Sequence, residues 1–164
     1  MIVLGIDPGS AVTGYGVIDT ERKKLKCVTY GAIRTPHEKD LADKLKIIYG
    51  SLDELIREYN PRDIALEDVF FGQNIQSALK LGQARGAAIL AAANNEKPVF
   101  TYAARAVKQA LTGNGAASKE QVQRMIQSLL RFQEPVRPLD ASDALAIAVC
   151  HARRREMHEL FSKL

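Results

Sequence analysis

The feature that most constrains this fold is the placement of carboxylates within or beside apolar stretches. Asp7 ends the first apolar run of the chain, Glu67 lies inside a later one, and Asp140 and Asp143 open a third. A buried carboxylate without a partner is strongly unfavourable, so we expect the fold to compensate these charges with something positive. Ligand sets made only of oxygen suit Mg²⁺ or Mn²⁺. The pattern therefore favours metal-dependent phosphoryl chemistry.

The composition is that of a globular chain with a full hydrophobic core. With 164 residues, of which 46% are hydrophobic, the chain has the length of one domain, and we expect a single domain over residues 1–164. A formal charge of +4 favours a polyanionic partner, although so small an excess is also ordinary for a soluble protein. Cys27 and Cys150 form no CxxC pair, which argues against a zinc site and indicates reduced thiols. Since we find no signal peptide and no charge-free membrane-spanning run, we expect a cytoplasmic protein without membrane partners.

Hydrophobic patterning predicts a mixed α/β fold. Three strands close in sequence suggest an antiparallel meander, and the later strands alternate with helices, which favours a sheet with helices on its faces. The predicted strands cover 2–7, 13–18, 25–33, 64–70 and 99–102. The predicted helices cover 41–59, 77–94, 104–111 and 118–130, and a last one starts near 140 and runs through 155.

The predicted elements place the acids at one edge. Ligands of such sheets gather at the carboxyl ends of the strands. Asp7 and Glu67 should therefore meet if their strands are parallel neighbours, and Asp140 and Asp143, three apart at a helix start, can close the cluster from above.

Spacing alone does not separate Glu67 from its acidic neighbours. Asp68 follows it directly and Asp63 opens the same strand, and for both we expect a solvated strand end. Asp140 has a structural alternative as well, because Asp is a common N-cap at a helix start.

Several segments, in order along the chain, resemble the RuvC family of crossover junction endodeoxyribonucleases. They are GIDPGS at 5–10, TGYG at 13–16, SALKLGQARG at 77–86, YAAR at 102–105, VKQ at 107–109 and DASDALA at 140–146. The resemblance implies a ribonuclease H-like fold with a mixed five-stranded sheet flanked by helices. It also implies a homodimer that nicks Holliday junctions symmetrically during recombination and DNA repair, leaving 5′-phosphate and 3′-hydroxyl ends. The implied partners are four-way junction DNA and the RuvA–RuvB branch-migration complex.

By position, the resemblance assigns the catalytic and metal-binding roles to Asp7, Glu67, Asp140 and Asp143. Two Mg²⁺ ions per subunit are expected, with Mn²⁺ as a substitute. Asp7 is expected to bridge both ions, Asp143, alone or with Asp140, to hold the ion that activates water, and Glu67 to support the ion at the leaving group.

The resemblance also implies DNA contacts. Lys108 and Lys119 flank the glycine-rich loop 113–115, and each matches a lysine of the family expected near the scissile phosphate; the alternative is a solvated helix face. Phe70 matches an aromatic residue near the junction centre, where it can stack on an unpaired base, while the role of Phe71 stays open. The alternative for either ring is the core.

Other features have structural interpretations. Gly82 and Gly86 allow another backbone to approach, and we expect packing against the sheet, with a dimer contact as the alternative. The basic run 153–155 suits the end of a helix, and we expect a solvated face. His151 and His158 are expected at the surface.

Two other functions remain open. An ATP-binding member of the same superfamily is disfavoured because such proteins duplicate the fold and carry a second phosphate loop, which this sequence lacks. A non-catalytic nucleic-acid module, or a paralogue acting on RNA, is the other alternative. Magnesium-dependent cutting of four-way DNA separates these functions from the leading one.

Overall fold

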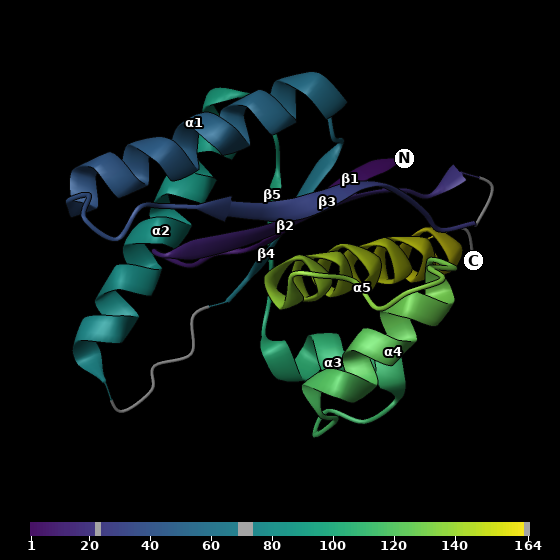
Figure 1. The fold of residues 1–164 in the computed structure, drawn as a ribbon. Coiled ribbons are helices and arrows are strands. Elements are labelled where there is room, and N and C mark those ends of the chain that lie inside the picture. Colours follow the sequence, from purple (N-terminus) through teal and green to yellow (C-terminus); the bar gives the residue numbers. More distant parts are fainter. Residues whose placement is uncertain (22–23, 69–73, 163–164) are drawn as a thin grey trace.

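Within the described residues, five strands form one mixed sheet (Figure 1). The computed structural model describes residues 1–21, 24–68 and 74–162. The strands are β1 (Ile2–Asp7), β2 (Val12–Asp19), β3 (Lys26–Arg34), β4 (Asp63–Glu67) and β5 (Val99–Tyr102). They lie in the order β3-β2-β1-β4-β5. The first three strands form the predicted antiparallel meander, and β4 runs parallel to both β1 and β5. The mixed five-stranded sheet is therefore confirmed.

Helices cover both faces of this sheet. They are α1 (Leu41–Tyr59), α2 (Ile75–Asn94), α3 (Ala104–Thr112), α4 (Lys119–Leu129) and α5 (Leu139–Phe161). Figure 1 shows α1 and α2 on one face and α5 on the other, with α3 and α4 packed beyond α5. The predicted capping box is present at the start of α4, where Ser118 and Gln121 satisfy each other's backbone N–H groups.

Each face of the sheet has its own apolar core. Leu4 and Ile6 of β1 lie in the core under α1 and α2, whereas Val3 lies in the core under α5. Because side chains of a strand point alternately to its two faces, Gly5 and Asp7 follow Val3 onto the α5 side. The strand period therefore sets the face on which Asp7 acts.

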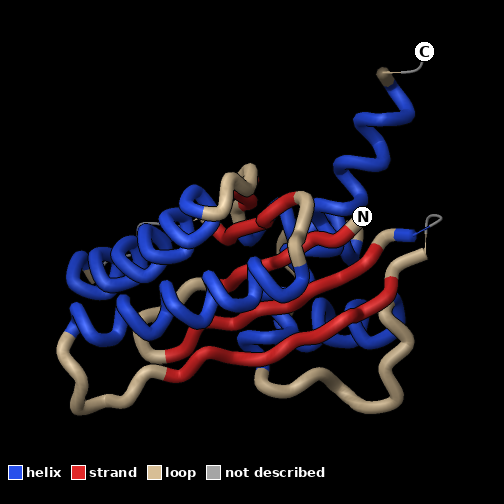
Figure 2. The backbone as a smooth tube through the Cα atoms, turned by 90° about the horizontal axis from the view of Figure 1, so that it is seen from above, coloured by secondary structure: helices blue, strands red, loops and turns tan. Residues whose placement is uncertain are grey.

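Helix α5 crosses the sheet and then extends past it. Its residues 144–152 are buried without interruption, which explains their continuous apolar sequence. The last turns project beyond the sheet toward the C-terminus (Figure 2) and expose Met157, Leu160 and Phe161. Neither α5 nor any other helix in the described ranges is long and apolar enough to cross a bilayer.

Candidate active site

The four acids selected from the sequence converge at one edge of the sheet. Asp7 and Glu67 are the last residues of β1 and β4, which are parallel neighbours. Asp140 and Asp143 lie at the start of α5, which passes over this edge. The carboxylates of the other three acids all act on the ionisation of Asp7. Asp7 is thus the common neighbour of the cluster.

Glycines in β1 and β2 allow α5 to come this close. Gly14 is the register partner of Asp7, and a Cβ atom on Gly14 would stand 2.0 Å from the carbonyl oxygen of Asp140. A Cβ atom on Gly5 would stand 2.1 Å from the carbonyl oxygen of Ala144. No other residue type leaves this space free. The two glycines therefore set the distance between Asp140 and Asp7.

The start of α5 differs in one detail from the sequence-based alternative. Pro138 is the N-cap of the helix, and Asp140 stands within the first turn. The N-cap role proposed for Asp140 is therefore wrong, and its side chain is available to the cluster. Its negative charge in the first turn is still favourable to the helix dipole.

Burial and mutual repulsion raise the pKa values of acids in this cluster. Burial, followed by the charge and hydrogen bond of Glu67 and the charges of Asp143 and Asp140, raises the pKa of Asp7 to about 8. Burial also raises the pKa of Glu67. A hydrogen bond between the carboxyl groups of Asp7 and Glu67 requires a proton between them. Without a bound cation, the cluster therefore keeps a proton at neutral pH.

Both predicted lysines act on this cluster. Lys119, the first residue of α4, places Nζ 3.1 Å from Oδ2 of Asp143, and the charge of Asp143 raises the pKa of Lys119. Lys108 of α3 adds a positive charge that lowers the pKa of Glu67 against the effect of burial. Since the side chain of Lys119 is 69% exposed, it can also reach a ligand outside the cluster.

The structure shows that, of the three acids at positions 63, 67 and 68, only Glu67 belongs to the acid cluster. Asp68 lies on the α2 side, 3.6 Å from the guanidinium of Arg85, and its side chain is 55% exposed, as predicted for a solvated strand end. For Asp63 the same prediction is wrong, because this residue is fully buried. His151 and Arg155 donate hydrogen bonds to Asp63 Oδ2 at 2.9 Å each.

His151 is buried as well, although we expected it at the surface. It is 1% exposed, and its Nδ1 lies 2.7 Å from the Tyr102 hydroxyl. The sequence does contain a signal for this burial. His151 follows Ile147 by four residues and Ala144 by seven, and both are buried on the same face of α5. His158 is exposed, as predicted.

The basic run 153–155 is only partly the solvated face that we expected. Arg154 is exposed. Arg155, by contrast, holds the buried Asp63 carboxylate, and Nη1 of Arg153 donates to the carbonyl oxygen of Ala110 at 2.8 Å. Arg153 and Arg155 therefore hydrogen-bond α5 to neighbouring elements, and the guanidinium of Arg154 lies 5.2 Å from the centre of the Tyr102 ring of β5.

The surroundings of the two α2 glycines differ from the prediction. Gly82 and Gly86 are exposed on α2, and a Cβ atom on either would meet nothing within 4 Å. The expected packing of these glycines against the sheet is therefore wrong. Phe70 and Phe71 lie outside the described residues.

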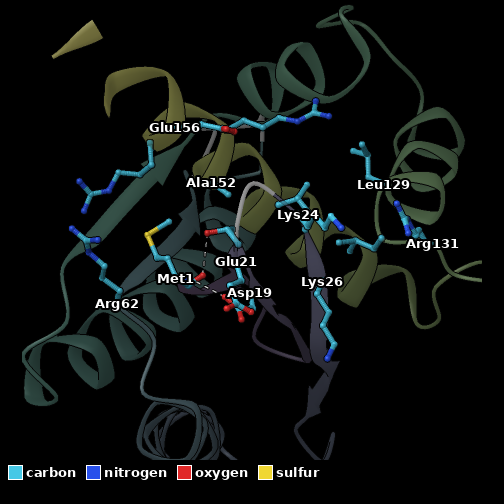
Figure 3. Close-up of a pocket in the computed structure, with 15 residues that line it drawn as sticks. Met1, Asp19, Glu21, Lys24, Lys26, Arg62, Leu129, Arg131, Ala152 and Glu156 are labelled. Atoms are coloured by element: carbon cyan, nitrogen blue, oxygen red, sulfur yellow. Dashed lines mark hydrogen bonds and ion pairs between the residues drawn. The ribbon is translucent and has the colours of Figure 1, made fainter. Parts of the chain in front are cut away.

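A large cavity lies at the opposite edge of the sheet and is separate from the acids (Figure 3). It has a volume of about 1090 Å³ and is lined by basic residues such as Arg62 and Arg131 together with Asp19 and Glu156. The N-terminal ammonium of Met1 pairs with Asp19 at 2.9 Å. This mixture of charges selects no single class of ligand, whereas the edge that holds Asp7 and Glu67 gathers carboxylates.

The donor set at the acid cluster suits a hard divalent cation, because carboxylate oxygens are the ligands that Mg²⁺ and Mn²⁺ prefer. Within the described ranges, no group of three or more acidic, histidine or cysteine side chains is arranged to hold a metal ion as it stands. The raised pKa of Asp7 and the Lys119 ammonium beside Asp143 both indicate excess negative charge that an entering ion would neutralise.

Known proteins match this chain over nearly its whole length. The family profile described as crossover junction endodeoxyribonuclease RuvC matches residues 3–151. The RuvC protein of Citrifermentans bemidjiense is 52% identical over 164 residues, which cover 100% of this chain and 99% of that protein. The Thermus thermophilus RuvC structure has a TM-score of 0.90 at 35% identity, covering 96% of this chain and 97% of the other.

A second solved structure, T. thermophilus RuvC in complex with Holliday junction substrate, has a TM-score of 0.91 at 34% identity and covers 96% of both chains. These matches confirm the ribonuclease H-like fold and the resemblance read from the sequence. The chain therefore belongs to the RuvC family of crossover junction endodeoxyribonucleases.

Proposed function

We propose that this chain is an endonuclease that resolves four-way DNA junctions by nicking two strands symmetrically during recombination and DNA repair. The observation that carries the proposal is the convergence of Glu67, Asp140 and Asp143 on Asp7. Membership of the RuvC family and the similarity to a RuvC protein bound to a Holliday junction support it.

The proposed cofactor is Mg²⁺, two ions per subunit, with Mn²⁺ as a substitute. The residues that would hold the ions are Asp7, Glu67, Asp140 and Asp143. The raised pKa of Asp7 supports this assignment, because a cluster built for cations has excess negative charge without them. When bound, such ions activate a water molecule and neutralise charge on the phosphate.

The chain's own residues orient this reaction. Water attacks phosphorus, the bond to the 3′ oxygen breaks, and that oxygen takes a proton, which leaves 5′-phosphate and 3′-hydroxyl ends. Lys119 is 69% exposed and pairs with Asp143, so it can turn toward a phosphate oxygen when the acids are neutralised. Lys108 adds positive charge from α3. Phe70 is proposed to stack on an unpaired base at the junction centre.

A second copy of the chain is the proposed partner of the exposed face of α2. Ile75, Leu79 and Leu90 are 74%, 61% and 53% exposed on this helix. Gly82 and Gly86 lie between them at helical spacing, with open space at both Cβ positions. An apolar stripe with small residues at its centre allows two identical helices to pack closely. A two-fold dimer also supplies the two active sites that symmetric nicking requires.

The RuvA–RuvB branch-migration complex as a further partner, and a cytoplasmic location, are proposed from the family resemblance alone.

Cleavage of a synthetic four-way junction with and without Mg²⁺ tests the proposed function. We expect paired nicks on the junction, little cutting of linear duplex of the same sequence, and no cutting with a chelator. Ca²⁺ should support binding without cutting, because its looser coordination places water poorly. A protein that binds the junction but never cuts it would be a non-catalytic module. A rise in melting temperature with ATP would instead favour a nucleotide-binding function.

A further inference from the structure

Glu67 stands at the end of β4, where the sheet holds it on one side only. The paired register between β1 and β4 ends at Ile6 and Leu66, one residue before Glu67. On the other side, Glu67 pairs with Tyr102 of β5, and the N–H of Asp68 donates to the Tyr102 carbonyl oxygen at 2.9 Å. The position of this acid therefore depends on contacts beyond β1.

Arg85 supplies such contacts from the middle of α2. Its Nε donates to the carbonyl oxygen of Glu67 at 3.3 Å, and its Nη2 donates to the Thr101 hydroxyl at 3.1 Å. Nη2 also lies 3.6 Å from the carboxylate of Asp68. The rigid fork of a guanidinium can hold several acceptors in fixed directions, whereas a lysine ammonium offers one point of charge. One side chain thus joins α2 to the ends of β4 and β5.

We propose that Arg85 is a positioning residue for Glu67, and that through it the packing of α2 against a second copy of the chain reaches the catalytic centre. The inference rests on the proposed function for the roles of Glu67 and of the dimer.

The position of Arg85 on α2 supports this link. Ala84 and Ala88 bury one side of the helix in the core shared with α1, and Gly82 and Gly86 lie on its exposed side. Arg85 lies between these two sides, and its side chain is 24% exposed. A shift of α2 caused by a partner helix therefore moves the guanidinium and the Glu67 main chain together. Hydrogen-bond partners of the ligating side chains themselves commonly affect metal affinity 10- to 100-fold. Because Arg85 holds the main chain of Glu67 instead, we expect an effect at the lower end of this range.

The first test is the Mn²⁺ affinity of Arg85→Lys, measured without DNA from the rise in melting temperature with Mn²⁺ concentration. We expect affinity about tenfold weaker than in the wild type, with junction affinity in Ca²⁺ unchanged. Lys80→Met, which removes an exposed cation from the same helix, is the control and should bind Mn²⁺ like the wild type.

Two results would overturn the positioning role. One is a Mn²⁺ affinity of Arg85→Lys equal to that of the wild type. The other is weaker junction binding with unchanged Mn²⁺ affinity, which would make Arg85 a DNA contact. If Arg85→Lys does not fold, the Mn²⁺ affinity of Thr101→Val tests the positioning role instead. This substitution removes the exposed hydroxyl that accepts a hydrogen bond from the Arg85 guanidinium. A wild type that Mn²⁺ does not stabilise would refute the metal site itself, and the inference with it.

The second test separates the link to the dimer from the positioning role. Leu79→Asp places a charge in the exposed stripe of α2, and we expect a monomer by sedimentation with Mn²⁺ affinity reduced toward that of Arg85→Lys. The double variant Leu79→Asp/Arg85→Lys should lose little more Mn²⁺ affinity than either single variant, since both changes act through the contact of Arg85 with Glu67. A monomer with wild-type Mn²⁺ affinity would overturn the link. A variant that stays dimeric would refute α2 as the interface while leaving the Arg85→Lys result intact.

Discussion

At the scale of single residues, Asp7 is the side chain whose charge the fold tolerates least. Its pKa is raised to about 8 from 3.8, chiefly by burial and then by Glu67. A carboxyl group whose pKa is higher in the folded state than in the unfolded chain makes its full contribution to the free energy of unfolding at pH values below its unfolded pKa. That stability is lost as the pH rises through the folded value. The metal-free protein should therefore lose stability between about pH 4 and pH 8 because of Asp7.

Asp7→Asn should consequently stabilise the metal-free protein. At pH 8, in the presence of a chelator, we expect a melting temperature higher by about 2 to 8 °C, corresponding to roughly 1 to 2 kcal/mol in a chain of this length. The gain should shrink toward pH 5, where wild-type Asp7 is protonated. Differential scanning calorimetry across this range measures it, and a gain that does not depend on pH would contradict the assigned pKa shift. Asp19→Asn is the control, because Asp19 ends β2 at the opposite edge.

The residues also show what could be predicted from the sequence. Asp7 could be found because it ends an apolar run, and the end of a strand is visible in a sequence. Glu67 lies inside such a run beside Asp68, and only the family resemblance selected it. Asp63 and Arg155 were misassigned because the contacts of Asp63 with His151 and Arg155 join positions 88 and 92 residues apart. The burial of His151, by contrast, was indicated by its helical spacing from Ile147. No local pattern reports that a buried acid at the start of a strand will meet a histidine and an arginine of a distant helix.

At the scale of elements, α5 is fixed to the sheet at two places. Near its start, Gly5 and Gly14 let its backbone lie directly on β1 and β2. Nearer its end, the buried Asp63 of β4 binds both His151 and Arg155. The first contact sets the height of Asp140 above Asp7, and the second prevents the helix from sliding along the strands.

Gly14→Ala tests the first of these contacts. Its Cβ atom would lie 2.0 Å from the Asp140 carbonyl oxygen, so the first turn of α5 must move. We expect a loss of about 1 to 3 kcal/mol in the free energy of unfolding and strongly reduced cleavage. Urea unfolding and a junction assay measure the two effects. The control is Gly50→Ala in α1, where a Cβ atom meets nothing within 4 Å and alanine should stabilise the helix by roughly 0.5 to 1 kcal/mol. Wild-type stability and activity in Gly14→Ala would contradict the close approach.

The contact of Asp63 with His151 and Arg155 predicts that stability depends on pH with a sign opposite to that predicted for Asp7. Burial lowers the pKa of His151, against the effect of Asp63. Burial alone would raise the pKa of Asp63, but the hydrogen bonds from Arg155 and His151 lower it on balance. A histidine with a lowered pKa in the folded state reduces stability as the pH falls below its unfolded value near 6.5.

His151→Gln should remove this loss, because glutamine stays neutral. We expect the difference in unfolding free energy between wild type and variant to change between pH 7 and pH 5, by at most about 1.4 kcal/mol per pH unit. Comparing the two proteins cancels the contribution of Asp7, and urea unfolding at each pH provides the values. Parallel curves would contradict a neutral His151 in the folded state.

The elements themselves were largely predictable, with failures at their ends. The helix predicted over 41–59 matches α1, because its apolar residues repeat at helical spacing up to Asn60, which has a left-handed φ of 43°. The strand predicted over 64–70 corresponds to β4 (Asp63–Glu67), and its last two predicted positions, 69 and 70, lie outside the described residues. Helix α5 runs to Phe161, beyond the predicted end, because its exposed last turns have no buried face to mark them.

At the scale of the whole molecule, one chain offers a single set of acids, whereas a four-way junction needs two equivalent cuts. The proposed dimer through α2 supplies the second set and relates the two sites by the symmetry of the substrate. The family resemblance predicted a homodimer, but the sequence left its surface open, because the same glycines of α2 also suited packing against the sheet. The open space beside Gly82 and Gly86 now favours the dimer contact.

Mixed dimers of wild type and Asp7→Asn should nick one strand of a cruciform and rarely complete resolution. With one competent site, a supercoiled cruciform plasmid should become a nicked circle, whereas the wild-type dimer should linearise it. Gel electrophoresis separates these products, and affinity tags on the two chains isolate the mixed species. Linear product formed by mixed dimers at the wild-type rate would contradict a requirement for two sites.

The measurement that tests the central claim most directly compares cleavage and binding for Asp7→Asn and Asp19→Asn on one synthetic four-way junction. Both residues end strands of the same sheet, but only Asp7 lies in the acid cluster. We predict that Asp7→Asn abolishes Mg²⁺-dependent cutting while binding the junction at least as tightly as the wild type, since it removes a negative charge near phosphates. Asp19→Asn should cut normally. Retained cutting by Asp7→Asn, or parallel loss of its binding and cutting, would contradict the assignment of these carboxylates as the metal-binding catalytic centre.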